Sequence, residues 1–331
     1  PEPVAGGLVV ATVIYTLHEA IGLTLAFESS LQTAFMLIFF SSIGLSANFA
    51  KLREGGMGLV VFLALIAVFI VVQNTVGIGL ASLLGLDPLI GLVAGSITLV
   101  GGHGTAGAWG SVLEGQYGLT GATTLGIACA TFGLVIGGLL GGPLAKRLIT
   151  RHQLAQARPD AEQLAPTAPT VPEGGERTNF EFPSNAPRLI TADAAIETLA
   201  LFAGCLAFAE FMTHLTKGTA IQLPTFVWAL GTGVVIRNVL DYVFNVQVFD
   251  RAIDVFGNAG LSIYLAMALL SLKLWELTDL AAPLMVILAV QTVMMGLYAG
   301  FVTFRLMGKN YDAAVLAAGH CGFGMGATPT A

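Results

Sequence analysis

Long apolar runs, separated by short charged or turn-forming stretches, dominate the pattern of this 331-residue chain. The longest run, 57–84, contains 28 residues without one charged side chain. About 18 consecutive apolar residues suffice for a membrane-spanning helix, whereas the strands of a membrane barrel alternate apolar and polar positions in short segments. The pattern therefore predicts an all-α, polytopic membrane protein.

Eight segments have the length and apolar character of spanning helices. They form two sets of four: 3–17, 31–49, 57–84 and 122–145, then 190–215, 224–240, 252–272 and 281–304. The stretch 150–188 separates the two sets and contains six of the thirteen prolines together with many charges. Such a composition cannot bury a packed core and is typical of a flexible linker. We therefore divide the chain into a first unit, 1–149, a linker, 150–188, and a second unit, 189–331.

Composition narrows the functional classes. Charged residues make up 10% and hydrophobic residues 55% of the chain, whereas an average soluble domain is about 25% charged. The three cysteines, Cys129, Cys205 and Cys321, lie far apart in apolar segments, which argues against a disulfide framework and a Cys-x-x-Cys metal motif. The sequence also lacks His-Glu-x-x-His and any serine–histidine or paired-aspartate arrangement on one expected helix. We expect neither an enzyme, nor a transition-metal site, nor a nucleic-acid partner.

Two glycine-rich segments, 87–121 and 311–331, do not fit as spanning helices, and the distribution of Lys and Arg indicates what the first one does. Lys and Arg mark the cytoplasmic loops of membrane proteins. If 87–121 enters and leaves the membrane on one side, twelve of the fourteen Lys and Arg residues share a side, and Lys217 and Lys273 lie opposite. If it spans, the split is ten to four. We therefore predict a re-entrant loop with "GGHGT" at its tip, and a cytoplasmic linker.

A helix that breaks inside a membrane indicates a binding site. Main-chain groups released by the break survive only where protein buries them or where they line a wet cavity. Free N–H groups at the start of a half-helix attract anions, and free carbonyls at its end attract cations. Broken helices at this depth are therefore typical of transporters.

The two sets of spans correspond to each other at a nearly constant offset. The matches are "LS" at 45–46 with "LS" at 270–271 (offset 225), Pro3 with Pro224 (offset 221), "AGS" at 94–96 with "AGH" at 318–320 (offset 224), and the Gly-rich 95–106 with 319–331. Matches in the same order at similar offsets predict an internal repeat. The charge count places the two Gly-rich loops on opposite sides, so the repeats are inverted, as in many secondary transporters.

Nearly the whole chain outside the linker resembles the sodium/glutamate symporter family. The resemblance lies in "PEPVAGG" (1–7), "IGLSANFAKLREGG" (43–56), "QNTVGIGLASLLGLDPLIGLVAGSITLVGGHGTAGAW" (73–109), "ACATFGLVIGGLLGGP" (128–143), "SLKLWEL" (271–277) and "GKNYDAAVLAAGHCGFGMGATPTA" (308–331). It implies two inverted halves of five helices, each with a re-entrant loop after its fourth helix, and import of glutamate with Na⁺ across the bacterial inner membrane. It also implies a first and a tenth helix that this chain lacks, so we expect the chain to be truncated at both ends.

Polar and glycine residues of the two Gly-rich loops are the candidates for substrate binding. They are Ser96, Thr98, Gly101, Gly102, His103, Gly104 and Thr105 in the first loop, and His320, Cys321, Gly322, Phe323, Gly324 and Thr328 in the second. The simpler alternative for a histidine is a bond to main chain freed by the turn. For Ser and Thr it is a bond to the carbonyl four residues earlier in the same helix.

Amide and carboxylate side chains inside or near the ends of the apolar spans are the candidates for Na⁺ coordination. They are Asn48, Gln73, Asn74, Asn258, Gln291 and Asp312. The alternative for the amides is hydrogen bonding between helices. For Asp312, as for Asp87, it is capping of the short helix that each begins.

The leading interpretation is Na⁺-driven uptake of glutamate, with Na⁺ as the coupling ion and no cofactor. Arg237 and Lys273 lie at span ends, so an anionic substrate would depend on half-helix N–H groups, hydroxyls and Na⁺. Alternatives are a transporter of another small carboxylate, a passive channel, or a cation/proton antiporter, for which Glu210 is the candidate carboxylate. The oligomeric state stays open, and a homodimer is one possibility.

Overall fold

The structure is a computed structural model that describes residues 2–22, 29–154, 190–219, 222–246, 248–270 and 280–326. Within these ranges every regular element is helical. The elements are α1 (Glu2–Ile21), α2 (Ser29–Ser46), α3 (Phe49–Glu54), α4 (Gly56–Leu83), α5 (Pro88–Leu92), the π-helical turn η1 (Val93–Ile97), α6 (Gly102–Tyr117), α7 (Ala122–His152), α8 (Ala192–Leu215), α9 (Thr225–Tyr242), α10 (Asp250–Leu270), α11 (Ala281–Tyr298), the π-helical turn η3 (Ala299–Thr303), α12 (Phe304–Leu306) and α13 (Tyr311–Gly326).

Each of the eight predicted spans is a helix in the structure. They are α1, α2, α4, α7, α8, α9, α10 and the run from α11 through η3 to α12. Five helices of the described residues are long and apolar enough to cross a membrane: α4, α7, α8, α10 and Ala281–Leu306. Helix α7 continues to His152, past the predicted boundary at 149, and most of the predicted linker lies outside the described residues, as do Lys273 and Thr328.

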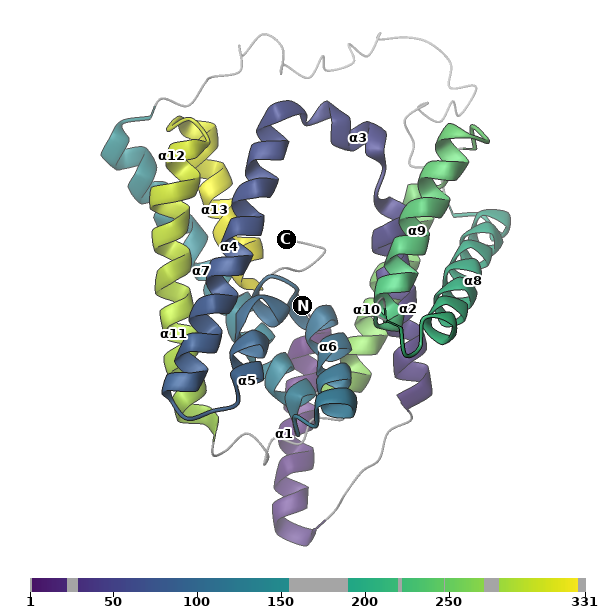
Figure 1. Cartoon of the computed structure of the whole chain (residues 1–331), viewed down its shortest axis with the longest axis horizontal. Coiled ribbons are helices and arrows are strands. Elements are labelled where there is room, and N and C mark those ends of the chain that lie inside the picture. The colour runs from purple at the N-terminus through teal and green to yellow at the C-terminus, as the bar shows by residue number, and fades with distance from the viewer. Residues whose placement is uncertain are drawn as a thin grey trace, which may run out of the picture.

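The helices pack into two bundles, which Figure 1 shows on opposite sides of the molecule. The broken-helix bundle consists of α4, α5, η1, α6, α7, α11, η3, α12 and α13. The straight-helix bundle consists of α1, α2, α8, α9 and α10. Helix α3 leads from α2 of one bundle to α4 of the other, and α6 touches α2 and α10. The Gly-rich sequence that begins at 101 therefore lies where the bundles meet.

Glycines on α7 allow α13 to pack main chain against main chain. A Cβ atom at Gly133 would overlap the carbonyl oxygen of Met325, and one at Gly141 would lie 2.8 Å from the carbonyl oxygen of Ala318. Gly133, Gly137 and Gly141 are four residues apart, so they share one face of the helix. Small residues at this spacing are typical of close helix contacts in membranes.

Glycines of α6 serve the contact between the bundles. A Cβ atom at Gly104 would lie 2.6 Å from Cε1 of Phe39 on α2, and one at Gly107 would overlap the hydroxyl of Tyr264 on α10. Both aromatic side chains are buried. Two of the glycines in "GGHGTAGAWG" are therefore explained by helix packing.

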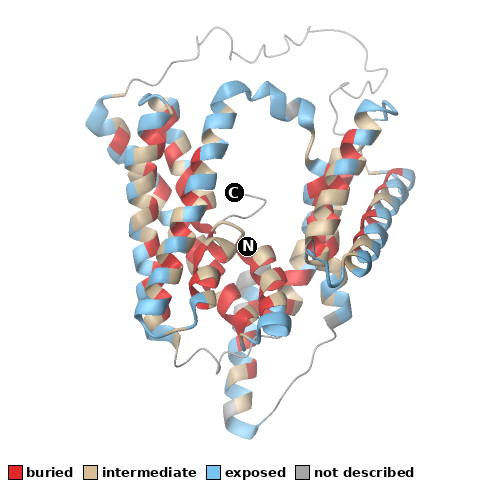
Figure 2. Cartoon of the chain, viewed as in Figure 1, coloured by how far each residue is buried: buried red, intermediate tan, exposed pale blue. Residues whose placement is uncertain are grey.

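Large apolar side chains cover much of the outside of the molecule. Figure 2 shows exposed residues along the outward faces of both bundles. On α4, Met57 is 76% exposed, Leu63 60%, Val71 65% and Leu83 84%. The hydrocarbon core of a bilayer is the solvent in which such a surface is stable.

Candidate functional site

The first predicted re-entrant segment is a helix that is interrupted in the middle. Helix α5 begins at Pro88, and the Asp87 carboxylate accepts a hydrogen bond of 2.8 Å from the Leu89 N–H, so the predicted cap is confirmed. The chain leaves helical geometry at Gly95, where φ is −106° and ψ is −136°. A new helix, α6, begins at Gly102.

Asn74 on α4 positions this interruption. The main-chain N–H of Ser96 donates to Oδ1 of Asn74 at 3.1 Å. A Cβ atom at Gly95 would lie 3.0 Å from the same oxygen, so a side chain there would push the Asn74 amide away from Ser96. One turn further along α4, Gly77 touches the main chain of Gly91 in α5. The break is therefore fixed against α4.

Gly102 begins α6 in the left-handed region, with φ of 69°. An L-residue with a side chain loses roughly 1–2 kcal/mol in that region. The residue before it, Gly101, gives the helix no side-chain cap. The first N–H groups of a helix lack intrahelical partners and carry partial positive charge. The start of α6 thus presents uncapped N–H groups that suit an anion.

Two buried glutamines join α4, α11 and the end of α13. Gln73 donates from Nε2 to the Gly324 carbonyl at 3.3 Å, and Gln291 donates from Nε2 to the Gln73 carbonyl at 2.9 Å. Both side chains are fully buried, and the Oε1 atom of each has no hydrogen-bond partner. A buried carbonyl oxygen without a donor is costly, and it is the type of ligand that hard cations prefer.

Gly133 of α7 brings the two Gly-rich segments together. A Cβ atom there would overlap the Met325 carbonyl at the end of α13 and would lie 2.8 Å from Cδ2 of Leu99 in the first break. The interruption before α6 and the end of α13 therefore face the same turn of α7. We call this region the break site and define it by Gln73, Asn74, Ser96, Gln291 and Gly324.

His103 is buried and bonds a threonine that the sequence analysis did not identify. Its Nε2 atom lies 3.0 Å from Oγ1 of Thr131 on α7. The Thr131 hydroxyl donates its own proton to the Ile127 carbonyl at 2.8 Å, so it accepts from the His103 Nε2–H. In the neutral ring, Nδ1 is then the nitrogen that can accept.

His320 is buried within aromatic rings. Its Nδ1 atom lies 2.8 Å from Oγ1 of Thr303, and its Nε2 atom has no hydrogen-bond partner. The ring stacks on Phe323 at a centroid distance of 5.1 Å. Edge contacts come from Phe62, Phe69 and Tyr298. Phe323, a predicted substrate residue, therefore packs on His320, and no three His, Cys, Asp or Glu side chains of the described residues cluster.

The hydroxyls of Thr98 and Thr105 both bond nearby main-chain carbonyls, and Thr105 bonds the carbonyl four residues earlier, as the simpler alternative has it. Thr98 donates to the Val93 carbonyl at 2.6 Å, and Thr105 donates to the Gly101 carbonyl at 2.8 Å. Both bonds lie within one stretch of chain, as is usual for threonine in membrane helices. These bonds stabilise the irregular backbone on either side of the break.

The remaining predictions on α13 include residues with packing roles. Cys321 is fully buried in the core of the broken-helix bundle. A Cβ atom at Gly324 would lie 2.7 Å from Sδ of Met295, whereas one at Gly322 would meet nothing within 4 Å. A side chain at position 324 would thus displace the Met295 side chain, whereas one at position 322 would meet open space.

Three of the predicted Na⁺ ligands lie away from the break site. Asn48 follows α2, and Asn258 is exposed on α10, so both belong to the straight-helix bundle. Asp312 is exposed in the first turn of α13. The expectation that it caps this helix is wrong, because the Ala313 N–H donates to Oδ1 of Asn310 at 2.8 Å.

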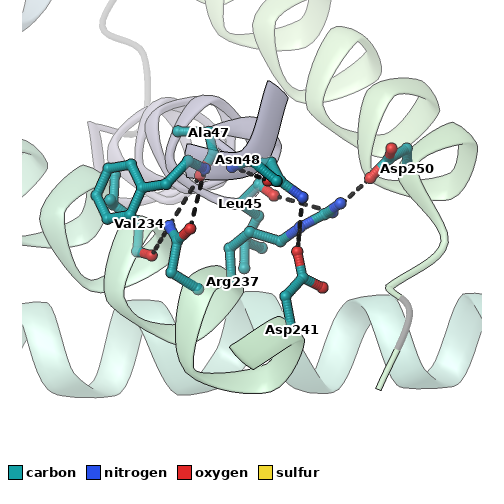
Figure 3. A network of polar contacts seen from close by, with 10 residues as sticks. Leu45, Ala47, Asn48, Val234, Arg237, Asp241 and Asp250 are labelled. Atoms are coloured by element: carbon teal, nitrogen blue, oxygen red, sulfur yellow. Dashed lines mark hydrogen bonds and ion pairs between the residues drawn. The ribbon is translucent and has the colours of Figure 1, made fainter. Parts of the chain in front are cut away.

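A charged network surrounds Arg237 at the end of the straight-helix bundle (Figure 3). Arg237 donates from Nε to Asp241 at 2.9 Å and from Nη1 to Asp250 and to the Leu45 carbonyl. Asn48 donates to the same Asp241 oxygen at 2.7 Å. Arg237 lies at a helix end as expected, but it is only 5% exposed. Its charge is neutralised by two carboxylates.

Asn238 fastens the connection between the bundles beside this network. It accepts from the Phe49 N–H at 3.0 Å and donates to the Ala47 carbonyl at 3.0 Å. This role of Asn238 was not predicted from the sequence.

The histidine partners Thr131 and Thr303 were not predicted either, because nothing in the sequence separates a threonine that bonds a distant side chain from one that bonds its own helix. The sequence analysis also missed the repeated spacing of four residues between the α7 glycines, which is visible in the sequence.

Five long apolar helices, together with a helix interrupted inside the broken-helix bundle, indicate an all-α, multi-pass membrane protein. The sequence model of the sodium/glutamate symporter family matches residues 1–331. The chain therefore belongs to the sodium/glutamate symporter family.

The chain is similar over its full length to relatives from several bacteria. It is 53% identical over 331 residues to the sodium/glutamate symporters of Escherichia coli (strain K12) and Shigella flexneri, covering 100% of this chain and 79% of each relative. It is 50% identical, with the same coverage, to the sodium/glutamate symporter of Haemophilus influenzae. No solved structure matches the chain.

Proposed function

We propose that this protein imports L-glutamate in symport with Na⁺. Its bacterial relatives at 50–53% identity are sodium/glutamate symporters by name, which supports this substrate and this ion. The structural observation that carries the proposal is the pair of fully buried glutamines whose Oε1 atoms lack donors. They join α4 and α11 to the end of α13, and Asn74, the neighbour of Gln73, holds the broken helix at Ser96. Transporters bind ions and substrates beside broken helices of this kind.

In this proposal the glutamines of the break site bind the cation, and the start of α6, which follows the break, binds the anion. Na⁺ binds the open oxygens of Gln73 and Gln291, and a carboxylate of glutamate binds the uncapped N–H groups at Gly102 and His103. Arg237 is the only buried Lys or Arg in the described part of the chain, and it is paired with two aspartates. An unneutralised anion in an apolar interior is strongly disfavoured. The transport of glutamate therefore requires the positive charge of Na⁺.

The helix contacts support the two inverted repeats. The repeat relates α1, α2 and α4 to α9, α10 and α11, so the α1–α10 contact corresponds to the α9–α2 contact, and both are present. The pairs α2–α10 and α4–α11 correspond to themselves and also pack. In Figure 1, α4 leads away from the end where α3 lies, whereas α11 leads toward α12 at that same end. Such opposite directions are what inversion requires.

The arrangement of chain ends supports a re-entrant first loop. Helix α4 starts at the α3 end of the molecule, and α7 finishes beside α12 at that end, where Arg147 and Arg305 line one pocket. The segment 87–121 thus begins and ends at the opposite end. We propose that the basic end faces the cytoplasm of a bacterium, and that the site becomes accessible from either side in turn through motion between the bundles.

The antiporter alternative finds little support. A cation/proton antiporter usually needs a carboxylate inside the membrane, and none of the buried residues in the described ranges is Asp or Glu. The candidate Glu210 is exposed and lies 3.2 Å from His214 of the same helix. A symporter therefore fits the buried polar groups better than an antiporter does.

Uptake of labelled glutamate into proteoliposomes tests the proposal. We expect accumulation above the external concentration with an inward Na⁺ gradient and none in choline. Equilibration without accumulation would indicate a channel, and uptake driven by a proton gradient in the absence of Na⁺ would contradict Na⁺ coupling. Competition by unlabelled aspartate or other small carboxylates determines the substrate range.

A further inference from the structure

A groove on the outside of the broken-helix bundle lies between α7 and the run from α11 to α12. It has a volume of about 630 Å³, and Leu140, Leu144, Leu297 and Phe301 are among the apolar residues that line it. Gly296 and Gly300 also line the groove, and a Cβ atom at Gly300 would lie 3.5 Å from Leu144, in ordinary van der Waals contact. Helices α11 and α12 form the edge of the molecule in Figure 1, away from the straight-helix bundle.

One end of this groove is strongly basic. Arg147, Arg151 and His152 come from the end of α7, and Arg305 and Lys309 come from α12 and the turn after it. None of the described residues that line the groove is acidic, and no ion pair between residues that the structure describes involves these five side chains. The Cζ atom of Arg305 lies 5.5 Å from the centroid of the Phe301 ring, where the basic end of the groove meets its apolar walls.

We propose that this groove binds an anionic phospholipid. The basic end takes the phosphate of the headgroup, and the apolar walls take the upper part of an acyl chain. Basic pockets between membrane helices at the bilayer surface suit anionic headgroups. Free phosphate would leave the apolar walls without an occupant, and a zwitterionic lipid would leave the positive charge uncompensated. The bound lipid bridges α7 and α12.

Lipid binding by the purified full chain in detergent tests this assignment. Native mass spectrometry measures titrations with phosphatidylglycerol and phosphatidylcholine of the same acyl chains. We expect the wild type to bind phosphatidylglycerol at least about tenfold more tightly, equivalent to about 1.4 kcal/mol. Inorganic phosphate at equal concentration should neither bind nor displace the lipid. The measurement does not involve transport, so its outcome is independent of the proposed symport.

Charge variants examine the basic end. Arg147→Gln with Arg305→Gln should lose the preference for phosphatidylglycerol. The matched control, Arg53→Gln with Lys146→Gln, removes the same charge from residues that do not line the groove, and it should keep the preference. Equal binding by both double variants would overturn the proposal.

Filling the groove provides a second test at constant charge. Gly300→Leu should reduce phosphatidylglycerol binding, whereas Gly142→Leu, where a Cβ atom meets nothing within 4 Å, should not. A wild type that binds neither lipid would overturn the proposal. The proposal would also be overturned if light scattering showed that Gly300→Leu converts a dimer into a monomer while lipid binding stays unchanged. The groove would then be a subunit interface.

Discussion

Gln73 on α4 donates a hydrogen bond to the main-chain oxygen of Gly324 on α13, 251 residues later in the chain. Its neighbour Asn74 accepts the N–H of Ser96 in the other Gly-rich segment. Two consecutive residues of one helix therefore contact the interruption before α6 and the end of the continuous helix α13. A movement of α4 relative to α7 would therefore strain both hydrogen bonds, because α6 and α13 also pack against α7.

Removal of the glutamine amides should weaken the response to Na⁺. Gln73→Leu and Gln291→Leu each delete an open oxygen and leave a main-chain carbonyl without its donor, which costs about 1–3 kcal/mol. We expect the Na⁺ concentration for half-maximal glutamate uptake to rise at least about tenfold in both. Initial uptake rates over a Na⁺ titration measure this effect.

Thr75→Val is the matched control for the glutamines. Thr75 is exposed on the same helix, and its hydroxyl bonds only the Val71 carbonyl. Its half-maximal Na⁺ concentration should stay within about twofold of the wild type, as expected for a solvated or lipid-facing position. Unchanged Na⁺ dependence in both glutamine variants would remove them from the ion site.

Gly102→Ala should lower both stability and uptake. The left-handed φ of 69° makes alanine unfavourable by roughly 1–2 kcal/mol. If the N–H groups at the start of α6 bind substrate, uptake should fall by more than the loss of folded protein explains. Thermal unfolding in detergent beside initial uptake rates separates the two effects.

Gly79→Ala controls for the general effect of a methyl group in a helix. Gly79 lies in α4, and a Cβ atom there meets nothing within 4 Å. Alanine should raise stability by up to about 1 kcal/mol, because it restricts the unfolded chain. Full specific activity in Gly102→Ala would show that the start of α6 does not bind substrate.

Arg237→Met should destabilise the protein far more than Asp250→Asn. Removing one member of a buried ion pair costs about 3–5 kcal/mol, because the partner charge stays buried. The side chain of Asp250 is 43% exposed, so water compensates for most of its loss. Thermal unfolding in detergent measures both changes. Adding Asp241→Asn to Arg237→Met should recover part of the stability, and no recovery would argue against an electrostatic origin.

Labelling of single cysteines tests the orientation in the membrane. In a background without Cys129, Cys205 and Cys321, cysteines at Gln116 and Gln153, both exposed, should react with an impermeant maleimide from opposite sides. We expect Gln153→Cys to react from the cytoplasm and Gln116→Cys from outside. Reaction of both from one side would exclude the re-entrant loop.

The length of each apolar run was enough to predict the eight helices. In a bilayer a chain must satisfy its main-chain hydrogen bonds within the segment, so run length alone leaves little choice of structure. The glycines of "GGHGT" predicted a break in this segment, but its position was wrong: the chain leaves helical geometry at Gly95, and residues 102–105 form the first turn of α6. Local chemistry also predicted the Asp87 cap and the bond of Thr105 to the carbonyl four residues earlier.

The partners of the polar side chains depended on how distant helices pack. Lipid and protein interior are both apolar, so a membrane helix has no amphipathic stripe that shows which face turns inward. The neighbouring residues in the sequence do not show which distant helix the side chain of Gln73, Asn48 or Arg237 contacts. The α7 glycines bring α13 within main-chain contact, and that packing places Gln73 beside Gly324. In the straight-helix bundle, the packing of α9 against α2 and α8 buries Arg237 between two aspartates, whereas Asn258 on α10 is exposed.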